Sequence, residues 1–361
     1  MEVEEIQYWL RWNRVSGIGP FRFYKLLEHF GSMKDAWNAP LEEVNPIIGS
    51  KAEAALAESR NWDPQVELDK IARLGFGIYC QADPGYPSLL KQISDPPPVL
   101  YVNGSFQYGD DIALAVVGTR TPSPLGAHHA RELAYNLGKQ GLTIVSGMAR
   151  GIDAEGHRGA MAAGARTIAV LGCGLNIAYP PEHRELMDAI AQNGAVISEF
   201  PLGTEPLATN FPARNRIISG LSLGVVVVEA AQDSGSLITA GFALEQGREV
   251  FAMPGNIGNE GSRGPHKLIR QGAKLIEDYR DILSELAIPH LSAPELAAAG
   301  VEQFSNIEQQ VLAVMSREPL HIDQILRRLD LVSSQLSAIL LQLEMKGAVK
   351  RFPGQLYLRI K

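Results

Sequence analysis

Leu114-Ala115-Val116-Val117-Gly118-Thr119-Arg120 joins an uninterrupted apolar run to a glycine turn that ends in an arginine. Such runs are typical of central strands in a parallel sheet, because helices cover both faces of that sheet. Similar runs recur as far as residue 276 and alternate with segments of helical periodicity. We expect strands at 112–117, 142–146, 167–171, 195–198, 223–229, 249–252 and near 274–276, and helices near 124–139, 154–163, 182–192, 236–247 and 279–286. The pattern predicts an α/β fold with a doubly wound parallel sheet.

Residues 1–62 have helical periodicity instead. Ile6–Val15 and Phe21–Phe30 are amphipathic, and the segment Val15-Ser16-Gly17-Ile18-Gly19-Pro20 lies between them. Pro20 suits the first turn of a helix, and the glycines permit a tight turn. We therefore expect an all-helical domain of the helix-hairpin-helix or SAM-like kind. The turn either offers free N–H groups to a phosphate or is only a structural αα-hairpin, and both interpretations stay open.

The end of the chain predicts a third domain. Residues 288–304 have the composition of a linker between a domain at 63–287 and one at 305–361. Helical segments at Asn306–Met315, Ile322–Leu329 and Ser334–Met345 precede a hairpin, in the order of a winged helix. The third segment contains no arginine or lysine, so contact with protein is as compatible with it as contact with DNA.

Composition limits the classes of function. The net charge of the 361 residues is −7, so a polyanion site has to be a local patch. The acidic amino terminus lacks the basic region of a signal peptide, and no apolar run reaches the roughly 18 residues of a membrane span, so we expect a soluble cytoplasmic protein. Cys80 and Cys173 lie far apart, outside any metal-binding spacing. We expect neither a metal nor a cofactor.

Three predicted turns place arginines among small residues. They are Gly118-Thr119-Arg120, Ser146-Gly147-Met148-Ala149-Arg150-Gly151 and Phe211-Pro212-Ala213-Arg214-Asn215-Arg216. Strand ends of a parallel sheet lie side by side, so we expect the turns to converge. Glycine lets a backbone approach a ligand closely, and arginine adds charge-assisted hydrogen bonds to phosphate. Gly235 and Ser236 begin a further helix whose N-terminus faces the same edge.

The third string adds an aromatic ring. Phe211 offers a stacking surface for an exposed base, and Asn215 offers hydrogen bonds, which together favour a single-stranded nucleic acid. In the competing interpretation Phe211 is buried and Arg214 and Arg216 pair internally. Both interpretations stay open.

Signs of catalysis are weak. The G-x-G-x-x-G dinucleotide fingerprint and the P-loop lysine are both absent from the turn after residue 117. Asp153 and His157 share a helix face, and we interpret them as a capping or packing pair. Glu229 stands alone as a candidate general base. The site is therefore expected to hold a phosphate chain without cleaving it.

The strings together resemble the DNA-processing protein A family (DprA, also called Smf). Val170-Leu171-Gly172-Cys173-Gly174, Ser234-Gly235-Ser236-Leu237-Ile238-Thr239-Ala240 and Gln246-Gly247-Arg248-Glu249-Val250-Phe251-Ala252-Met253-Pro254-Gly255-Asn256 add to the three arginine turns. The resemblance implies an extended Rossmann-like domain between a small helical domain and a winged-helix domain. Carried over residue by residue, the phosphate-binding positions are Gly118, Thr119, Arg120, Ser146, Gly147, Arg150, Gly151, Arg214, Asn215 and Arg216.

The resemblance also implies a function. Members bind incoming single-stranded DNA in natural transformation, protect it and load the recombinase RecA onto it, without catalytic turnover and commonly as homodimers through the Rossmann domain. Two alternatives remain. A nucleotide-phosphate hydrolase of a related fold would release free base, and a winged-helix transcription regulator would bind duplex DNA.

Overall fold

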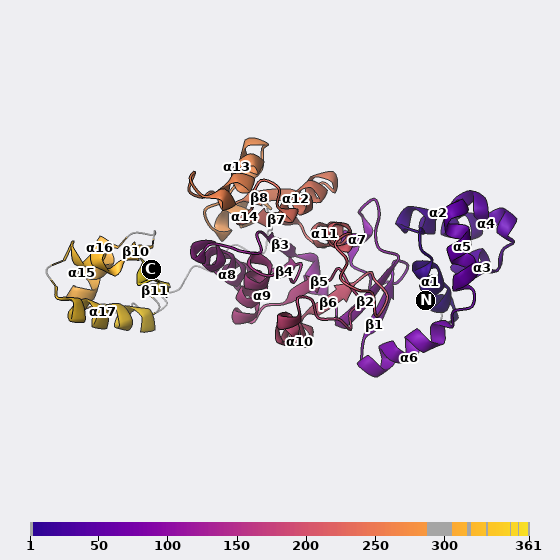
Figure 1. The fold of residues 1–361 in the computed structure, drawn as a ribbon, viewed down its shortest axis with the longest axis horizontal. Coiled ribbons are helices and arrows are strands. Elements are labelled where there is room, and N and C mark those ends of the chain that lie inside the picture. Colours follow the sequence, from indigo (N-terminus) through magenta and orange to yellow (C-terminus); the bar gives the residue numbers. More distant parts are fainter. Residues whose placement is uncertain are drawn as a thin grey trace. The chain divides into compact units, whose positions relative to one another are not determined.

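The structure is a computed structural model that describes residues 3–286, 305–315, 319–329, 331–346, 348–352 and 354–359. It forms two compact units, Met1–Leu291 and Ser292–Lys361, which we describe separately (Figure 1). The predicted linker at 288–304 lies outside the described residues.

A nine-stranded sheet organises the first unit, in the order β1-β2-β6-β5-β4-β3-β7-β8-β9. The seven strands from β6 to β9 are parallel, whereas β2 pairs antiparallel with both β6 and β1. The strands are β1 Gly77–Cys80, β2 Val99–Gly104, β3 Ala113–Val117, β4 Thr143–Ser146, β5 Thr167–Val170, β6 Ala195–Ser198, β7 Gly224–Val227, β8 Glu249–Ala252 and β9 Lys274–Leu275. The predicted doubly wound α/β fold is confirmed.

Helices cover both faces of this sheet, as continuous apolar strands require. Ala115 and Val117 of β3 pack in one cluster with residues of α11 and α12, while Leu114 and Val116 pack in another with residues of α8 and α9. The helices of this part are α7 Ser88–Lys91, α8 Pro124–Lys139, α9 Ile152–Ala162, α10 Arg184–Asn193, α11 Asn210–Gly220, α12 Gly235–Glu245, α13 Arg263–Arg270 and α14 Tyr279–Glu285, with short 3₁₀ turns at Tyr108–Asp111, Pro181–His183 and Glu260–Ser262.

One sequence expectation was wrong here. The string from Phe211 to Arg216 is not a turn, because it forms the first part of helix α11. Pro212 is compatible with this helix because it lies in the first turn. Proline breaks a helix interior, but it is tolerated in the first turn, where its missing N–H has no helical partner anyway.

The amino-terminal helices pack beside the β1 edge of the sheet. Gly17 has a φ of +86° in the predicted hairpin, and Pro20 is the first residue of α2, as expected. A hydrophobic cluster that contains Trp9 and Trp12 also includes Tyr101 of β2, so the helices and the sheet edge share one core. The helices are α1 Val3–Arg14, α2 Pro20–Phe30, α3 Met33–Asn38, α4 Leu41–Ile48, α5 Ser50–Ser59 and α6 Pro64–Leu74. The predicted boundary at residue 62 falls between α5 and α6.

The second unit has the helices and hairpin expected of a winged helix. A three-stranded sheet in the order β10-β12-β11 lies with three helices around its own apolar cluster. The elements are α15 Asn306–Val314, β10 Leu320–His321, α16 Ile322–Leu326, α17 Ser333–Met345, β11 Val349–Phe352 and β12 Leu356–Arg359.

Candidate nucleic-acid interface

A groove opens where the order of the strands reverses. From β3 the chain proceeds through β4, β5 and β6 on one side and through β7, β8 and β9 on the other. Ligands of open α/β sheets bind outside the carboxyl ends of the strands at such a point. Here a groove of about 560 Å³ is lined by residues that follow β3 and β7 and by the first turns of α11 and α12.

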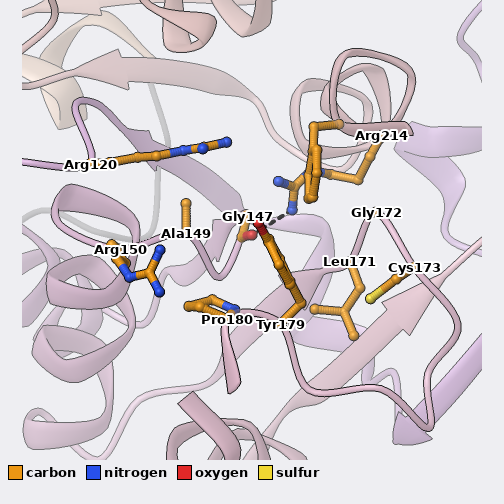
Figure 2. Close-up of a pocket in the computed structure, with 11 residues that line it drawn as sticks. Arg120, Gly147, Ala149, Arg150, Leu171, Gly172, Cys173, Tyr179, Pro180 and Arg214 are labelled. Atoms are coloured by element: carbon orange, nitrogen blue, oxygen red, sulfur yellow. Dashed lines mark hydrogen bonds between the residues drawn. The ribbon is translucent and has the colours of Figure 1, made fainter. Parts of the chain in front are cut away.

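A narrower pocket of about 20 Å³ adjoins the groove (Figure 2). The groove and the pocket share five lining residues, which are Arg120, Ala149, Tyr179, Phe211 and Arg214. Ten predicted site residues border one or both cavities, namely Gly118, Thr119, Arg120, Gly147, Arg150, Phe211, Arg214, Asn215, Gly235 and Ser236. The structure therefore brings most of the predicted residues to one place.

The turn after β3 presents Arg120 to this groove. Gly118 has to be glycine, because a Cβ atom there would lie 2.6 Å from the Ile152 side chain and 2.7 Å from the Glu229 carbonyl oxygen. The Thr119 N–H donates to that same carbonyl, at 2.6 Å. Arg120 is exposed, and it has no ion-pair partner in the described part of the chain. Its guanidinium is therefore available to a ligand.

Glu229 holds this turn and has no free carboxylate for catalysis. One carboxylate oxygen accepts from the Ser123 N–H at 2.8 Å, and the other accepts from the Ser123 hydroxyl at 2.5 Å. The absence of a side chain at Gly126 provides space for this carboxylate, because a Cβ atom there would lie within 2.6 Å of it. The isolated glutamate of the sequence is thus an anchor for the start of helix α8.

The residues of the turn after β4 have different roles, and only some of them border the groove or the pocket. Ser146 is fully buried and donates to the Val116 carbonyl at 2.6 Å, so it serves the sheet and not the groove. Gly151 has a φ of +76° and borders neither cavity. A Cβ atom there would lie 2.4 Å from the Thr119 carbonyl oxygen, so glycine lets the first two turns touch. Arg150 is half exposed and forms an ion pair with Glu182.

Asp153 does not cap the helix that follows, which corrects one prediction. Helix α9 begins after Gly151, and the Asp153 carboxylate reaches backward to accept from the N–H groups of Gly147 and Ala149, at 3.1 and 3.4 Å. Burial raises the pKa of Asp153, and the nearby Arg214 guanidinium opposes that rise. The carboxylate thus organises the second turn from below.

His157 belongs to the core, as the packing interpretation expected. It is fully buried, and its Nδ1 lies 2.7 Å from the Thr167 hydroxyl. Burial lowers the pKa of His157 to about 3, with a further contribution from nearby positive charge. The imidazole is therefore neutral at pH 7 and has no contact with the groove.

Phe211 lines both the groove and the narrower pocket, and three other side chains that line both lie around its ring. Its ring centroid lies 5.4 Å from that of Tyr179, with 34° between the planes. The guanidinium carbons of Arg120 and Arg214 lie 5.8 and 5.9 Å from the same centroid. Gly172 makes this possible, because a Cβ atom there would lie 2.9 Å from the Phe211 ring. In Figure 2 the Arg120 side chain extends from the left and the Arg214 side chain from the right, and the Tyr179 ring lies below them.

Arg214 is a buried cation at the floor of this site. Only 5% of the residue is exposed, and its Nη1 donates to the Gly147 carbonyl at 2.5 Å and also to the Val170 carbonyl. Burial lowers the pKa of Arg214 to about 10, and the Asp153 carboxylate opposes the change. The side chain remains charged at pH 7, and it ties α11 to the ends of β4 and β5.

Arg216 and Asn215 point to different partners. The Arg216 guanidinium is 6% exposed and forms ion pairs with Asp95 at 2.9 Å and with Glu199 at 2.7 Å. It borders neither cavity, so the internal-pairing interpretation holds for this arginine. Asn215 does border the groove, and its amide donates to the Gly235 carbonyl at 3.3 Å.

The first turn of α12 completes the groove. Ser234 caps this helix by accepting from the Ser236 N–H at 3.4 Å, and Gly235 and Ser236 line the cavity. A helix N-terminus favours negative charge, because its first N–H groups lack helical partners.

Sequence reasoning missed Tyr179 altogether. It lines both cavities from the loop that follows β5, only five residues beyond the Gly172-Cys173-Gly174 turn. An aromatic residue close to a glycine turn at the carboxyl edge was the available signal.

Within the described residues there is no group of three metal-ligating side chains, and no helix is long and apolar enough to cross a membrane.

Two family profiles match this chain. The profile described as DNA recombination-mediator protein A covers residues 77–287, and the DprA winged helix domain covers residues 290–355. Protein Smf of Synechocystis sp. is 36% identical over 99% of this chain and 100% of its own length. DNA processing protein DprA of Streptococcus pneumoniae is 45% identical over 75% of this chain and 95% of its own length.

Solved structures agree with these matches. The X-ray structure of DprA from Streptococcus pneumoniae has a TM-score of 0.70 at 38% identity, and the match covers 77% of this chain and 97% of that one. A structure of DNA processing protein A from Helicobacter pylori, reported for its single-stranded DNA binding mode, has a TM-score of 0.53 at 30% identity over 59% of this chain and 95% of that one. The chain therefore belongs to the DNA recombination-mediator protein A family, whose relatives carry the names DprA and Smf.

Proposed function

We propose that this protein binds single-stranded DNA in the groove, protects the strand during natural transformation and loads the recombinase RecA onto it. The observation that carries DNA binding is the Phe211 ring, which lies close to the Tyr179 ring and to the guanidinium groups of Arg120 and Arg214. A stacking surface beside cations suits a strand whose bases are exposed, because each base has a π-face and each phosphate a charge. A duplex hides those faces, so the site should prefer a single strand.

The phosphate contacts divide into direct and supporting roles. Arg120 is the exposed cation, and the N-terminus of α12 at Gly235 supplies an uncharged donor. Arg214 supplies positive potential from the floor of the groove. Arg216 and Ser146 support the structure behind it and do not take part in binding.

RecA loading, homodimerisation through the Rossmann-like domain and action in the cytoplasm rest on the family relationship. The single-stranded DNA named for the Helicobacter pylori relative supports the choice of ligand. We propose binding without catalytic turnover, because Glu229, the isolated candidate base, is engaged with Ser123. The released base expected of a nucleotide hydrolase would contradict this assignment.

A binding titration tests the proposal. Full-length protein is titrated against fluorescent oligothymidine and against a duplex of the same length, and RecA filament assembly is then followed on the bound strand. We expect single strands to bind at least about tenfold more tightly, with a log–log salt slope of roughly −0.7 per phosphate contact. Tighter binding of duplex would favour a winged-helix regulator instead.

Variants locate the site within the same titration. Arg120→Ala should weaken single-strand binding about tenfold and reduce the salt slope by about 0.7, since one charge-assisted contact is lost. Arg270→Ala removes an exposed cation of α13 that lines neither cavity and should leave binding unchanged. Equal effects of the two substitutions would refute the placement of the site.

A further inference from the structure

A second hollow lies on the other side of the loops that border the groove. It has a volume of about 370 Å³ and is lined by Lys70, Arg73 and Leu74 of α6 and by Asn176, Leu202 and Gly203. Both cations are exposed, and neither contacts a carboxylate in the described part of the chain. Arg73 donates only its Nε, to the Asp69 carbonyl at 3.2 Å. The lining therefore contains two free positive charges and no negative one.

The groove and this hollow share their dividing wall. Two loops form it, at 171–180 and 199–209, and they are hydrogen-bonded to each other. The Gly174 N–H donates to the Thr204 carbonyl at 2.9 Å, and the Gly203 N–H donates to the Asn176 side chain at 2.8 Å. A Cβ atom on Gly174 would lie 2.7 Å from the Gly203 nitrogen, so the loops are also in close contact.

The wall is short enough for one strand of nucleic acid to cross. Asn176 faces the hollow and Tyr179 faces the groove, and three residues of extended chain span at most about 10 Å. Likewise Gly203 lines the hollow and Pro206 lines the groove. Asp153, which is buried beneath the groove, is the one carboxylate among the residues that line the two cavities, whereas Glu205 is exposed on the second loop between Gly203 and Pro206.

We infer that the bound single strand continues from the Phe211 groove over the paired loops to a second phosphate-binding site formed by Lys70 and Arg73. The inference rests on the proposed function, and it assigns α6 to the DNA-binding surface. The ligand class is the phosphodiester backbone, since the hollow offers cations and an amide but no aromatic ring for stacking. Contact there should therefore be independent of base sequence.

Oligonucleotides of two lengths distinguish binding in the groove alone from binding that also reaches the second site. Full-length wild-type protein and Lys70→Gln/Arg73→Gln are titrated over a range of salt with oligothymidines of two lengths. One of about 5 nucleotides lies near the lower end of the usual range for such sites, and one of about 20 nucleotides exceeds its upper end. For the long strand, the double variant should bind 3- to 10-fold more weakly by our rough expectation, and its salt slope should fall by about 1.4, which corresponds to two phosphates. The short strand should bind both proteins equally.

The control variant changes two exposed cations that have the same spacing on a different helix. Lys267 and Arg270 are exposed, three residues apart and in the last turn of α13, as Arg73 is in the last turn of α6. Lys267→Gln/Arg270→Gln should leave both strands unaffected, and thermal melting checks that α6 remains folded in the Lys70/Arg73 variant. A wild-type slope for the long strand in that variant would overturn the second site alone. Failure of wild-type protein to bind either strand would overturn the proposed function itself.

Discussion

The turn after β3 and the start of helix α11 look alike in sequence but serve different purposes. Each places arginine close to small residues at the same edge of the sheet. Arg120 is exposed at the groove, whereas Arg216 is buried between Asp95 and Glu199. The difference lies in the surroundings, because two carboxylates pair with Arg216, whereas none in the described part of the chain pairs with Arg120. An arginine in a suggestive string is therefore a candidate ligand contact only when its own protein leaves it unpaired.

The largest effect should come from the buried side of this comparison. Arg216→Ala leaves the Glu199 carboxylate, whose side chain is 14% exposed, without its partner. We expect a loss of about 3–5 kcal/mol in the free energy of unfolding, measured by urea denaturation, because an unpaired buried charge is costly. Arg216→Met with Glu199→Gln removes both charges and should restore much of the loss. An unchanged stability of Arg216→Ala would place the ion pair outside the folded core.

The second test concerns a buried imidazole on helix α9. His157 has a pKa of about 3 in the folded protein against 6.5 in the unfolded chain, so between these values only the unfolded chain binds the proton. Its contribution to stability is complete above pH 6.5 and is lost progressively as the pH falls toward 3. In that window wild-type protein should lose about 1.4 kcal/mol more per pH unit than His157→Gln. Parallel pH profiles of the two proteins would contradict this.

The third test concerns the exposed groove and asks whether a base stacks on the Phe211 ring. Phe211→Leu keeps an apolar side chain against Gly172 but removes the aromatic face. We expect single-strand affinity to fall by about 1–3 kcal/mol, with an unchanged salt slope because no charge is altered. The contrast is with Arg120→Ala, which should change the slope. A smaller slope in Phe211→Leu would mean that the ring acts by orienting the guanidinium groups.

The smallest effect should come from Arg150, which is intermediate between the two cases. It is exposed but engaged with Glu182. Glu182→Gln frees its guanidinium, so single-strand binding should strengthen up to a few-fold and the salt slope should steepen by about 0.7. Glu185→Gln removes an equal charge from the same helical region without touching Arg150 and should change the slope far less. Equal changes would show a general effect of charge.

The sheet was predictable because its strands are apolar on both faces, a local pattern that a sequence displays directly. The meeting of the turns also followed, since parallel strands end at one edge. The partners of Arg216 did not follow, because Asp95 lies 121 residues away along the chain and only the tertiary fold brings it near. Asp153 was misassigned for a related reason. Its position near a helix start suggested a cap, but its carboxylate bonds the preceding loop.

Glu229 holds both ends of the Arg120 turn, with its main chain on Thr119 and its side chain on Ser123. The loop that presents Arg120 is thus already rigid before any ligand arrives. Binding then requires little loss of conformational entropy from the protein, so most of the ordering cost falls on the flexible strand. The strand transfer proposed above would benefit from this arrangement, because release returns that entropy to the DNA and leaves the loop ready for the next strand.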